Sequence, residues 1–150
     1  MNLKIRKANK SDAEGIINLI VELAIFEKLV PPDKNAQSRF VKHAFSPKPL
    51  FDILIALDDK TPIGYAFYYF TYSTFLAKQT MFLEDIFVSE RYRSKGVGKQ
   101  LFDELINIAK KKNCGRLDFT VLDWNKNAMK FYNRQGAKAL KEWVYYRMTL

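Results

Sequence analysis

Cysteine and histidine are nearly absent from this sequence, with Cys114 and His43 the single representatives of their types among 150 residues. One cysteine cannot form a disulfide within the chain, and one histidine leaves a zinc ion without its usual ligands. A lone residue of either type more often packs or lies at the surface than reacts, so neither receives a role. The sequence therefore predicts no metal site.

Long hydrophobic runs are also missing. The best candidate, residues 16–26, is interrupted by Asn18 and Glu22, whereas a membrane-spanning helix needs roughly 18 or more mostly apolar residues. The first residues, Met1 to Lys4, lack the apolar stretch of a secretory signal. We therefore expect a cytoplasmic protein with no membrane partner.

The composition itself is an ordinary globular mixture that is 48% hydrophobic, 15% aromatic and 27% charged. Low hydrophobicity is what keeps chains unfolded, so this mixture and the length predict one folded domain over residues 1–150. Lysine and arginine outnumber the acidic residues, and the formal net charge is +9. Such a charge favours anionic partners, which include nucleic acid, a phosphorylated cofactor and an acidic membrane.

Hydrophobic periodicity and turn residues predict alternating groups of strands and helices. Strands are expected at residues 3–6, 51–57, 63–71, 80–88, 117–121 and 143–148, and helices with their caps at residues 11–26, 33–45, 98–113 and 125–135. The S-x-x-E spacing of Ser11 and Glu14 predicts a capping box at the first helix. Meander strands followed by a β-α-β unit imply an α/β fold with a mixed sheet and helices on both faces.

An aromatic strip covers the strand expected at residues 63–71 and the residue after it. Such a strip resembles a surface on which RNA bases stack, but a sheet core combined with a dimer face explains it better. Its members are Tyr65, Phe67, Tyr68, Tyr69, Phe70 and Tyr72.

A pair of glycines, Gly96 and Gly98, lies between an expected strand and an expected helix, with Arg93, Lys95 and Lys99 around it. Glycine permits a positive φ and close backbone approach, and a turn before a helix presents amides to phosphate oxygens. The pattern matches neither a Walker loop nor a dinucleotide-binding fingerprint. By itself it is equally typical of a plain structural turn.

Three motifs together resemble those of the GNAT N-acetyltransferase superfamily. Residues 83–88 read LEDIFV, the loop supplies an R-x-x-G-x-G pattern from Arg93, and residues 124–137 read WNKNAMKFYNRQGA. The first and third motifs resemble the diamine (spermidine/spermine) and thialysine acetyltransferase branch. The resemblance implies the GNAT fold with its mostly antiparallel sheet, acetyl-CoA as cosubstrate, a homodimer, and direct acetyl transfer to a primary amine of a small cationic substrate.

The same resemblance assigns the acetyl-CoA site. The pyrophosphate is expected on the amides of residues 94–99, and the pantetheine chain beside residues 86–88, where a backbone amide polarises the thioester carbonyl. Residues of the later motif are expected to help hold the cosubstrate. The complete set is Ile86, Phe87, Val88, Arg93, Ser94, Lys95, Gly96, Val97, Gly98, Lys99, Asn125 and Ala128.

Two residues are expected to act in catalysis by resemblance. Glu84 occupies the position that the family uses for the base or amine anchor. A base is needed because an alkylammonium with a pKa of about 10.4 has no lone pair at neutral pH. Tyr132 matches a tyrosine that contacts the sulfur and can protonate the leaving thiolate. The alternatives are a salt-bridged strand carboxylate for Glu84 and a packed helix ring for Tyr132.

The resemblance places the amine between carboxylates. Phe26 and Glu27 correspond to a Tyr-Glu pair of the polyamine branch, and phenylalanine lacks the hydroxyl of that tyrosine. Glu27 and Glu84 give a cationic amine a local acidic pocket. Asp85 joins this substrate set, although strand alternation sends it to the other face unless a bulge intervenes.

Other functions stay open at this point. The same chemistry could modify a protein lysine or N-terminus, and the fold could bind CoA as a sensor without turnover. A nucleic-acid-binding module would use the net charge and the aromatic strip. That module gives no reason for Glu84, Tyr132 and the glycine turn to occur in the family's register, so nucleic acid is not the expected partner.

Overall fold

The computed structural model describes the whole chain, residues 1–150, as two compact units. The first unit runs from Met1 to Phe119 and the second from Thr120 to Leu150. The first contains every strand, and the second contains one helix, α4 (Lys126–Arg134).

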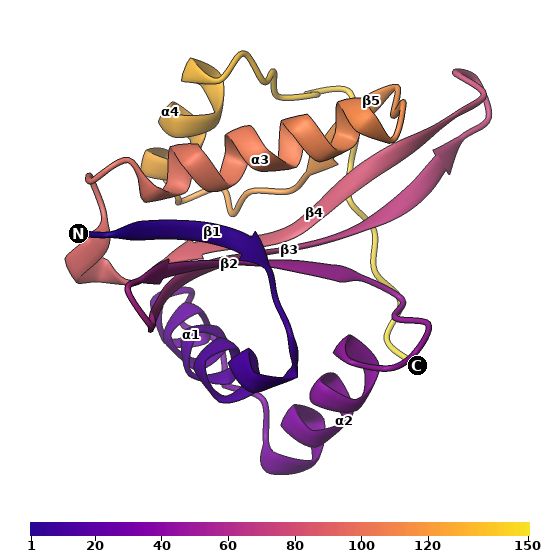
Figure 1. Ribbon diagram of the computed structural model, residues 1–150. Coiled ribbons are helices and arrows are strands. Elements are labelled where there is room, and N and C mark those ends of the chain that lie inside the picture. The colour runs from indigo at the N-terminus through magenta and orange to yellow at the C-terminus, as the bar shows by residue number, and fades with distance from the viewer. The chain divides into compact units, whose positions relative to one another are not determined.

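The first unit is built on a five-stranded sheet with the strands in sequence order, β1-β2-β3-β4-β5 (Figure 1). Neighbouring strands are antiparallel except for β4 and β5, which run parallel. The mixed, mostly antiparallel sheet expected from the sequence is therefore confirmed. Its strands are β1 (Leu3–Lys7), β2 (Asp52–Asp58), β3 (Thr61–Ser73), β4 (Lys78–Val88) and β5 (Arg116–Phe119).

Helices cover both faces of the sheet, which confirms the predicted α/β fold class (Figure 1). α1 (Ala13–Phe26) and α2 (Lys34–Ala44) lie on one face, and α3 (Val97–Lys111) lies on the other. No helix of the protein combines the length and the hydrophobicity that a membrane crossing requires.

The core forms where the helices meet the middle of the sheet. Ile16 and Leu19 of α1, three residues apart and so on one helix face, pack with Ile55 of β2 and Tyr65 of β3. Because helices cover both faces, five successive residues of β2 are buried. On the other face, α3 buries residues at helical spacing, namely Val97, Leu101, Phe102, Leu105 and Ala109.

The start of α1 differs from the sequence prediction. A short 3-10 helix, Lys10–Asp12, leads directly into α1, and its capping box is formed by Asn9 and Asp12, whose carboxylate accepts a 2.8 Å hydrogen bond from the Asn9 amide. The predicted box of Ser11 and Glu14 is therefore wrong. The earlier pair has the same spacing, and the two hydrogen bonds that Arg6 donates to Asp12, at 2.7 and 2.8 Å, hold its carboxylate in place.

The second unit begins its helix at Asn125, whose side-chain oxygen accepts a 3.1 Å hydrogen bond from the Ala128 amide. Gly136, with φ of 87°, lies just after the helix, where the sequence predicted the stop. Residues 143–148 form no strand, so the sixth predicted strand is wrong. A strand requires a hydrogen-bonded neighbour along its length, and the second unit contains no other strand.

Candidate active site

A β-bulge in β4 brings two successive acidic residues into the same region. Asp85 pairs with Phe67 of β3 while Leu83 pairs with Tyr68, so Glu84 is an extra residue without a partner in the register. A bulge of this kind bends the strand and redirects a side chain. From the sequence, Asp85 was expected to share a face with Glu84 only if a bulge lay between the strands, and that bulge is present.

The contacts of the two carboxylates show that they face the same side of the sheet. Glu84 accepts a 3.0 Å hydrogen bond from the hydroxyl of Tyr69. Asp85 lies near the buried hydroxyl of Tyr65, which has no hydrogen-bond partner by distance and angle. These tyrosines are four residues apart on β3 and therefore share a face. Tyr65 packs against α1 in the core, so both acids lie on the α1 side.

Burial and like charge shape the ionisation of this acidic cluster. Burial, then Glu84 and Glu27, raise the pKa of Asp85 to about 6, although the Tyr65 hydroxyl opposes the shift. Burial also raises the pKa of Glu27, which follows the last residue of α1. The pKa of Tyr65 is raised well above its usual value, first by burial and then by Asp85 and Glu27. The cluster can bind a cation and accept a proton near neutral pH.

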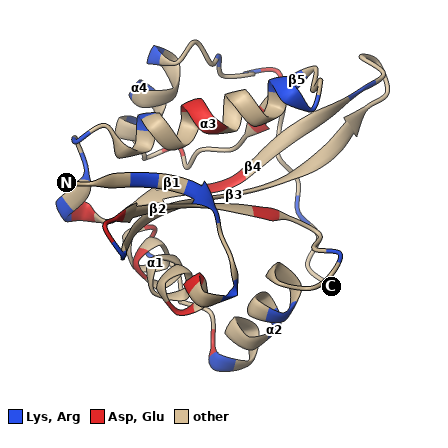
Figure 2. Ribbon diagram, in the orientation of Figure 1, with Lys and Arg blue, Asp and Glu red and all other residues tan.

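This acidity is local. The formal net charge of the chain is +9, yet Figure 2 shows the acidic pair as a red segment within β4. The two tyrosines of β3 were assigned by the sequence to core and dimer face, and their contacts with Glu84 and Asp85 were missed. Only the β3–β4 register reveals them, because a single sequence gives no signal for which residues face one another.

The end of β4 has a free backbone edge beside the acidic pair. β5 pairs with residues Thr80 to Leu83 only, so Ile86, Phe87 and Val88 have no strand neighbour on that side. Backbone amides and carbonyls at such an edge can pair with an extended ligand. This edge is where the sequence predicts the pantetheine chain.

The glycine loop that follows has the geometry of an anion-binding turn. Ser94 and Gly96 both have positive φ, 60° and 83°, and Gly96 is the N-cap of α3. No side chain caps this helix, and its first backbone bond runs from the Gln100 amide to the Gly96 carbonyl at 3.1 Å. The amides of residues 97–99 therefore precede the helical ladder and can donate to phosphate oxygens.

The basic side chains of the loop have protein partners. Lys99 forms an ion pair with Asp103 at 2.6 Å, one helical turn along α3. The Lys95 ammonium lies 5.3 Å from the centre of the Tyr92 ring. Arg93 donates from Nε to the Val88 carbonyl at 2.9 Å. The loop can therefore hold a diphosphate through its amides without relying on these side chains.

The model of the GNAT acetyltransferase family matches residues 18–137 of this chain. The protein belongs to the GNAT family. It is an acetyl-CoA-dependent N-acetyltransferase, as the motifs around Glu84 and the glycine loop predicted.

Two curated relatives of this GNAT protein are amine acetyltransferases by name. The thialysine N-epsilon-acetyltransferase of Mus musculus is 36% identical over 155 residues, which cover 96% of this chain and 91% of the relative. The spermidine/spermine N(1)-acetyltransferase-like protein 1 of Homo sapiens is 32% identical and covers 97% of this chain but 22% of its own length. The branch resemblance inferred from the motifs is confirmed.

A solved structure shares the fold along almost the whole chain. It is an integron cassette protein from the mobile metagenome of V. cholerae, 28% identical, with a TM-score of 0.85. The match covers 99% of this chain and 93% of the other.

The remaining GNAT motif residues lie in the second unit. Asn125 uses its side chain to cap α4, and Ala128 donates the amide to that cap. Tyr132 is buried, with 9% of its surface exposed, and its ring lies edge-on to Phe131 at 5.2 Å between centres. Asn125, Ala128 and Tyr132 therefore have structural roles, in helix capping or ring packing. The sequence predicted cosubstrate contacts at the same positions.

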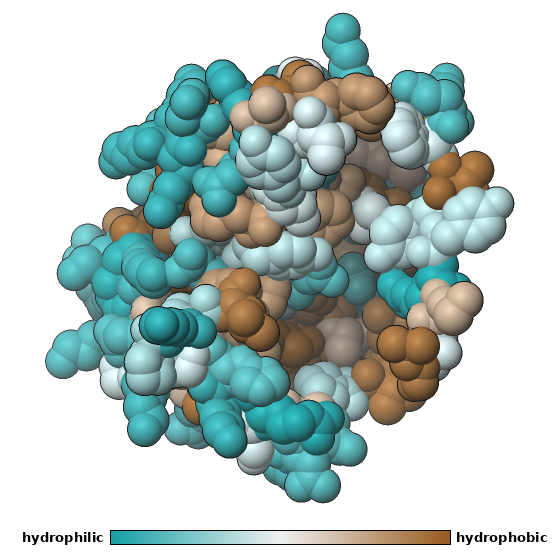
Figure 3. Space-filling view, turned by 90° about the vertical axis from the view of Figure 1, so that its right-hand side faces the viewer, coloured by the Kyte–Doolittle hydropathy of each residue, from teal (hydrophilic) through white to brown (hydrophobic).

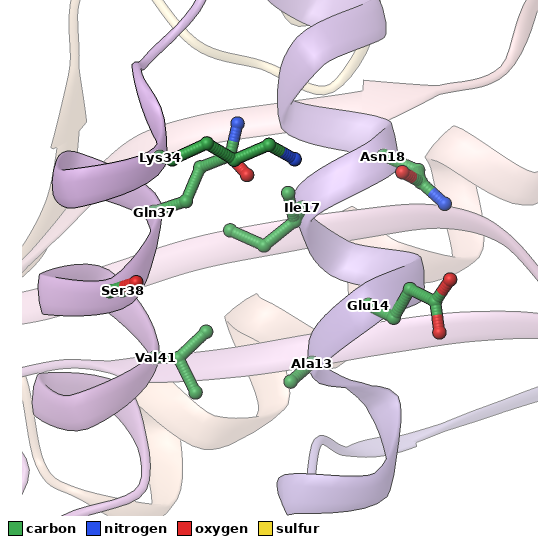
Figure 4. Close-up of a pocket in the computed structure, with 8 residues that line it drawn as sticks. All are labelled: Ala13, Glu14, Ile17, Asn18, Lys34, Gln37, Ser38 and Val41. Carbon is green, nitrogen blue, oxygen red and sulfur yellow. The ribbon is translucent and has the colours of Figure 1, made fainter.

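A groove between α1 and α2 is separate from the predicted site. It has a volume of about 530 Å³, and Figure 4 shows Ile17 and Val41 pointing into the space between the helices. Glu14 and Asn18 point away from α2 in the same view. None of the predicted site residues lines this groove, whose members are Ala13, Glu14, Ile17, Asn18, Lys34, Gln37, Ser38 and Val41.

Proposed function

We propose that this GNAT enzyme acetylates a primary amine of a small cationic substrate, namely a polyamine, a diamine or a lysine-like compound. One feature carries the proposal: the bulge in β4 brings Glu84 and Asp85 to the same side of the sheet, and Glu27 lies near enough to raise the pKa of Asp85, in a chain with a net charge of +9. Charges beyond about 8 Å are largely screened at physiological salt, so this local cluster decides the attraction of an ammonium. The substrates in the names of the relatives, thialysine and spermidine/spermine, belong to the same class.

Glu84 is proposed as the base that removes the proton of the amine, directly or through one water. Its exposed carboxylate is reachable by a ligand, and Tyr69 orients one of its oxygens. Asp85, Glu27 and Phe26 are proposed to hold the cationic substrate. As the N–C bond forms and the C–S bond of the thioester breaks, the proton lost by the amine passes to Glu84.

The acetyl-CoA contacts are proposed from the loop and the free edge of β4. The amides of residues 94–99 bind the pyrophosphate, and residues 86–88 bind the pantetheine chain and polarise the thioester carbonyl. Asn125 and Ala128 are proposed as further cosubstrate contacts on the basis of the family motif. Tyr132 gives its proton to the departing thiolate. This proposal is supported by the uncapped start of α3 and the unpaired end of β4.

A thiol-release assay tests the function. Purified protein with acetyl-CoA is offered spermidine, diamines, lysine analogues and peptides bearing a lysine or a free N-terminus. We expect turnover with the small amines, and Glu84→Gln should lower kcat about a hundredfold or more. Glu90→Gln, at an exposed glutamate two residues after the end of β4, is the matched control and should leave kcat unchanged. Faster turnover of the peptides, or none with any amine, would contradict the proposal.

The chain is also proposed to act as one cytoplasmic domain that forms a homodimer. The family match spans both units, which supports a single acetyltransferase domain over residues 1–150. Figure 3 faces the side where the β3–β4 hairpin ends, and hydrophobic side chains gather there. Tyr72, Phe75 and Leu76 of this hairpin are exposed and suit a second copy. Light scattering should give the dimer mass, and Phe75→Glu should yield monomers.

A further inference from the structure

Arg93, the first residue of the glycine-loop motif, makes contacts that point away from phosphate binding. Its Nε donates to the Val88 carbonyl at 2.9 Å, at the end of β4. Its guanidinium carbon lies 4.5 Å from the centre of the Phe26 ring and 5.2 Å from that of Phe87. The two rings are themselves 6.5 Å apart. One side chain therefore joins the end of α1 to the end of β4.

The Arg93 guanidinium contacts aromatic rings and forms no ion pair with Glu27, Glu84 or Asp85. It is not among the causes of the pKa shifts of Glu27 or Asp85, which come from burial and from neighbouring acids. A guanidinium over aromatic faces is attracted by the ring quadrupoles, and its planar shape makes the stacking specific. The contact fixes Phe26, and Phe26 directly precedes Glu27.

We propose that Arg93 is a positioning residue of the amine site: it clamps Phe26, and through it Glu27, against the end of β4. The inference rests on the proposed function, because it assigns Glu27 and Asp85 to the acceptor amine. The loop amides then bind acetyl-CoA, while the side chain of the same loop sets the distance between the two substrate sites. A phosphate-binding role for the guanidinium is the competing explanation.

Clamping of Phe26 and binding of phosphate predict different results when lysine replaces Arg93. Arg93→Lys keeps the positive charge but loses the Nε–H donor and the planar stacking surface. Arg93→Ala loses all three. Under the clamp, both variants raise the KM for the amine about fivefold or more, while the Kd for acetyl-CoA by calorimetry stays within about twofold. Phe26→Leu should do the same, and the Arg93→Ala/Phe26→Leu double variant should add little to either single change.

A titration gives a readout independent of turnover. Asp85 faces Glu84 on its own strand, Glu27 from α1 and Tyr65 from β3. If Glu27 withdraws, one cause that raises the pKa of Asp85 is removed, so carboxyl NMR should show its pKa falling in both Arg93 variants. Arg91 is the matched control: it is exposed and lies 5.1 Å from the Tyr92 ring, so Arg91→Lys should change neither KM nor the Asp85 titration.

Each outcome decides between the roles. An unchanged amine KM and Asp85 titration, with acetyl-CoA binding weakened about tenfold by alanine and retained by lysine, would overturn the clamp. Thermal unfolding of each variant identifies general instability, and Arg93→Lys is the variant expected to keep the fold. If the wild type acetylates no small amine, the proposed function fails, but the titration still reports whether Arg93 positions Glu27.

Discussion

The hydroxyl of Tyr69 donates a 3.0 Å hydrogen bond to the carboxylate of Glu84, joining neighbouring strands at a bulge. The bond leaves the carboxylate exposed to ligands while it limits the orientations of a residue that has no partner in the ladder. Orientation of a proton acceptor matters because proton transfer requires the amine within hydrogen-bonding reach.

Removal of that hydroxyl should reduce turnover without disturbing the fold. We expect Tyr69→Phe to lower kcat/KM about fivefold, the effect of losing roughly 1 kcal/mol of hydrogen bonding. Steady-state kinetics with a small amine measures the change, and Tyr72→Phe on the same strand is the exposed control. Equal losses in the two variants would show that Tyr69 does not orient Glu84.

Asp85 should make wild-type stability fall as pH rises from about 4 to about 6. Its pKa of about 6 in the folded protein exceeds the usual 3.8, so the folded state binds the proton more tightly and loses that advantage above pH 6. We expect Asp85→Asn to remove this fall, gaining up to about 3 kcal/mol over wild type between pH 4 and pH 7. Urea unfolding across this range measures it. Stability curves of wild type and variant that stay parallel would contradict the assignment.

The glycine loop offers a test that separates binding from folding. A Cβ on Gly98 would meet its nearest neighbour, Val88 Cγ2, at 3.8 Å, an ordinary contact. We therefore expect Gly98→Asp to fold normally but to weaken acetyl-CoA binding at least tenfold, because a negative charge enters the anion site. Calorimetry measures affinity, and Gly98→Ala controls for bulk. Unchanged affinity in Gly98→Asp would remove the loop from the site.

Asp12 should contribute to stability with the opposite pH dependence. The hydrogen bond from Arg6 holds the pKa of its carboxyl below 3.8, against the effect of burial. Its contribution is therefore present near neutral pH and is lost as acid protonates it. We expect Asp12→Asn to destabilise by roughly 2 kcal/mol at pH 7, and by less in acid. Glu14→Gln should leave the free energy of unfolding unchanged, because Ser11 and Glu14 form no capping box. A clear loss of stability in that variant would show that they do form one.

The sequence predicted most of the fold because the relevant signals are local. Apolar spacing in α1 and α3 and the run of apolar residues in β2 each identify an element by its own period. The strand at residues 143–148 failed because its pattern is equally local, whereas a strand depends on a partner elsewhere. The cap at Asn9 was missed because two pairs share one spacing, and the Arg6 contact that accompanies the one formed is made in three dimensions.

In the predicted site, too, local signals were found from the sequence and contacts made in three dimensions were missed. The motif around Glu84 and the paired glycines identified the family, because those residues act through their type and spacing. The bulge, the tyrosine partners and the Arg93 stack depend on which residues face one another, and periodicity carries no such information. For Arg93, the motif alone suggested a cosubstrate contact, whereas its side chain lies on Phe26.

One residue of β4 is surplus to the architecture of the sheet. With Glu84 deleted, Leu83 and Asp85 would become direct neighbours opposite Tyr68 and Phe67, and the ladder would run on uninterrupted. Because Glu84 is the proposed base, we expect the shortened chain to keep the sheet and to bind acetyl-CoA but not to transfer its acetyl group. The bulge therefore adds the proposed base to a sheet whose pairing does not require that residue.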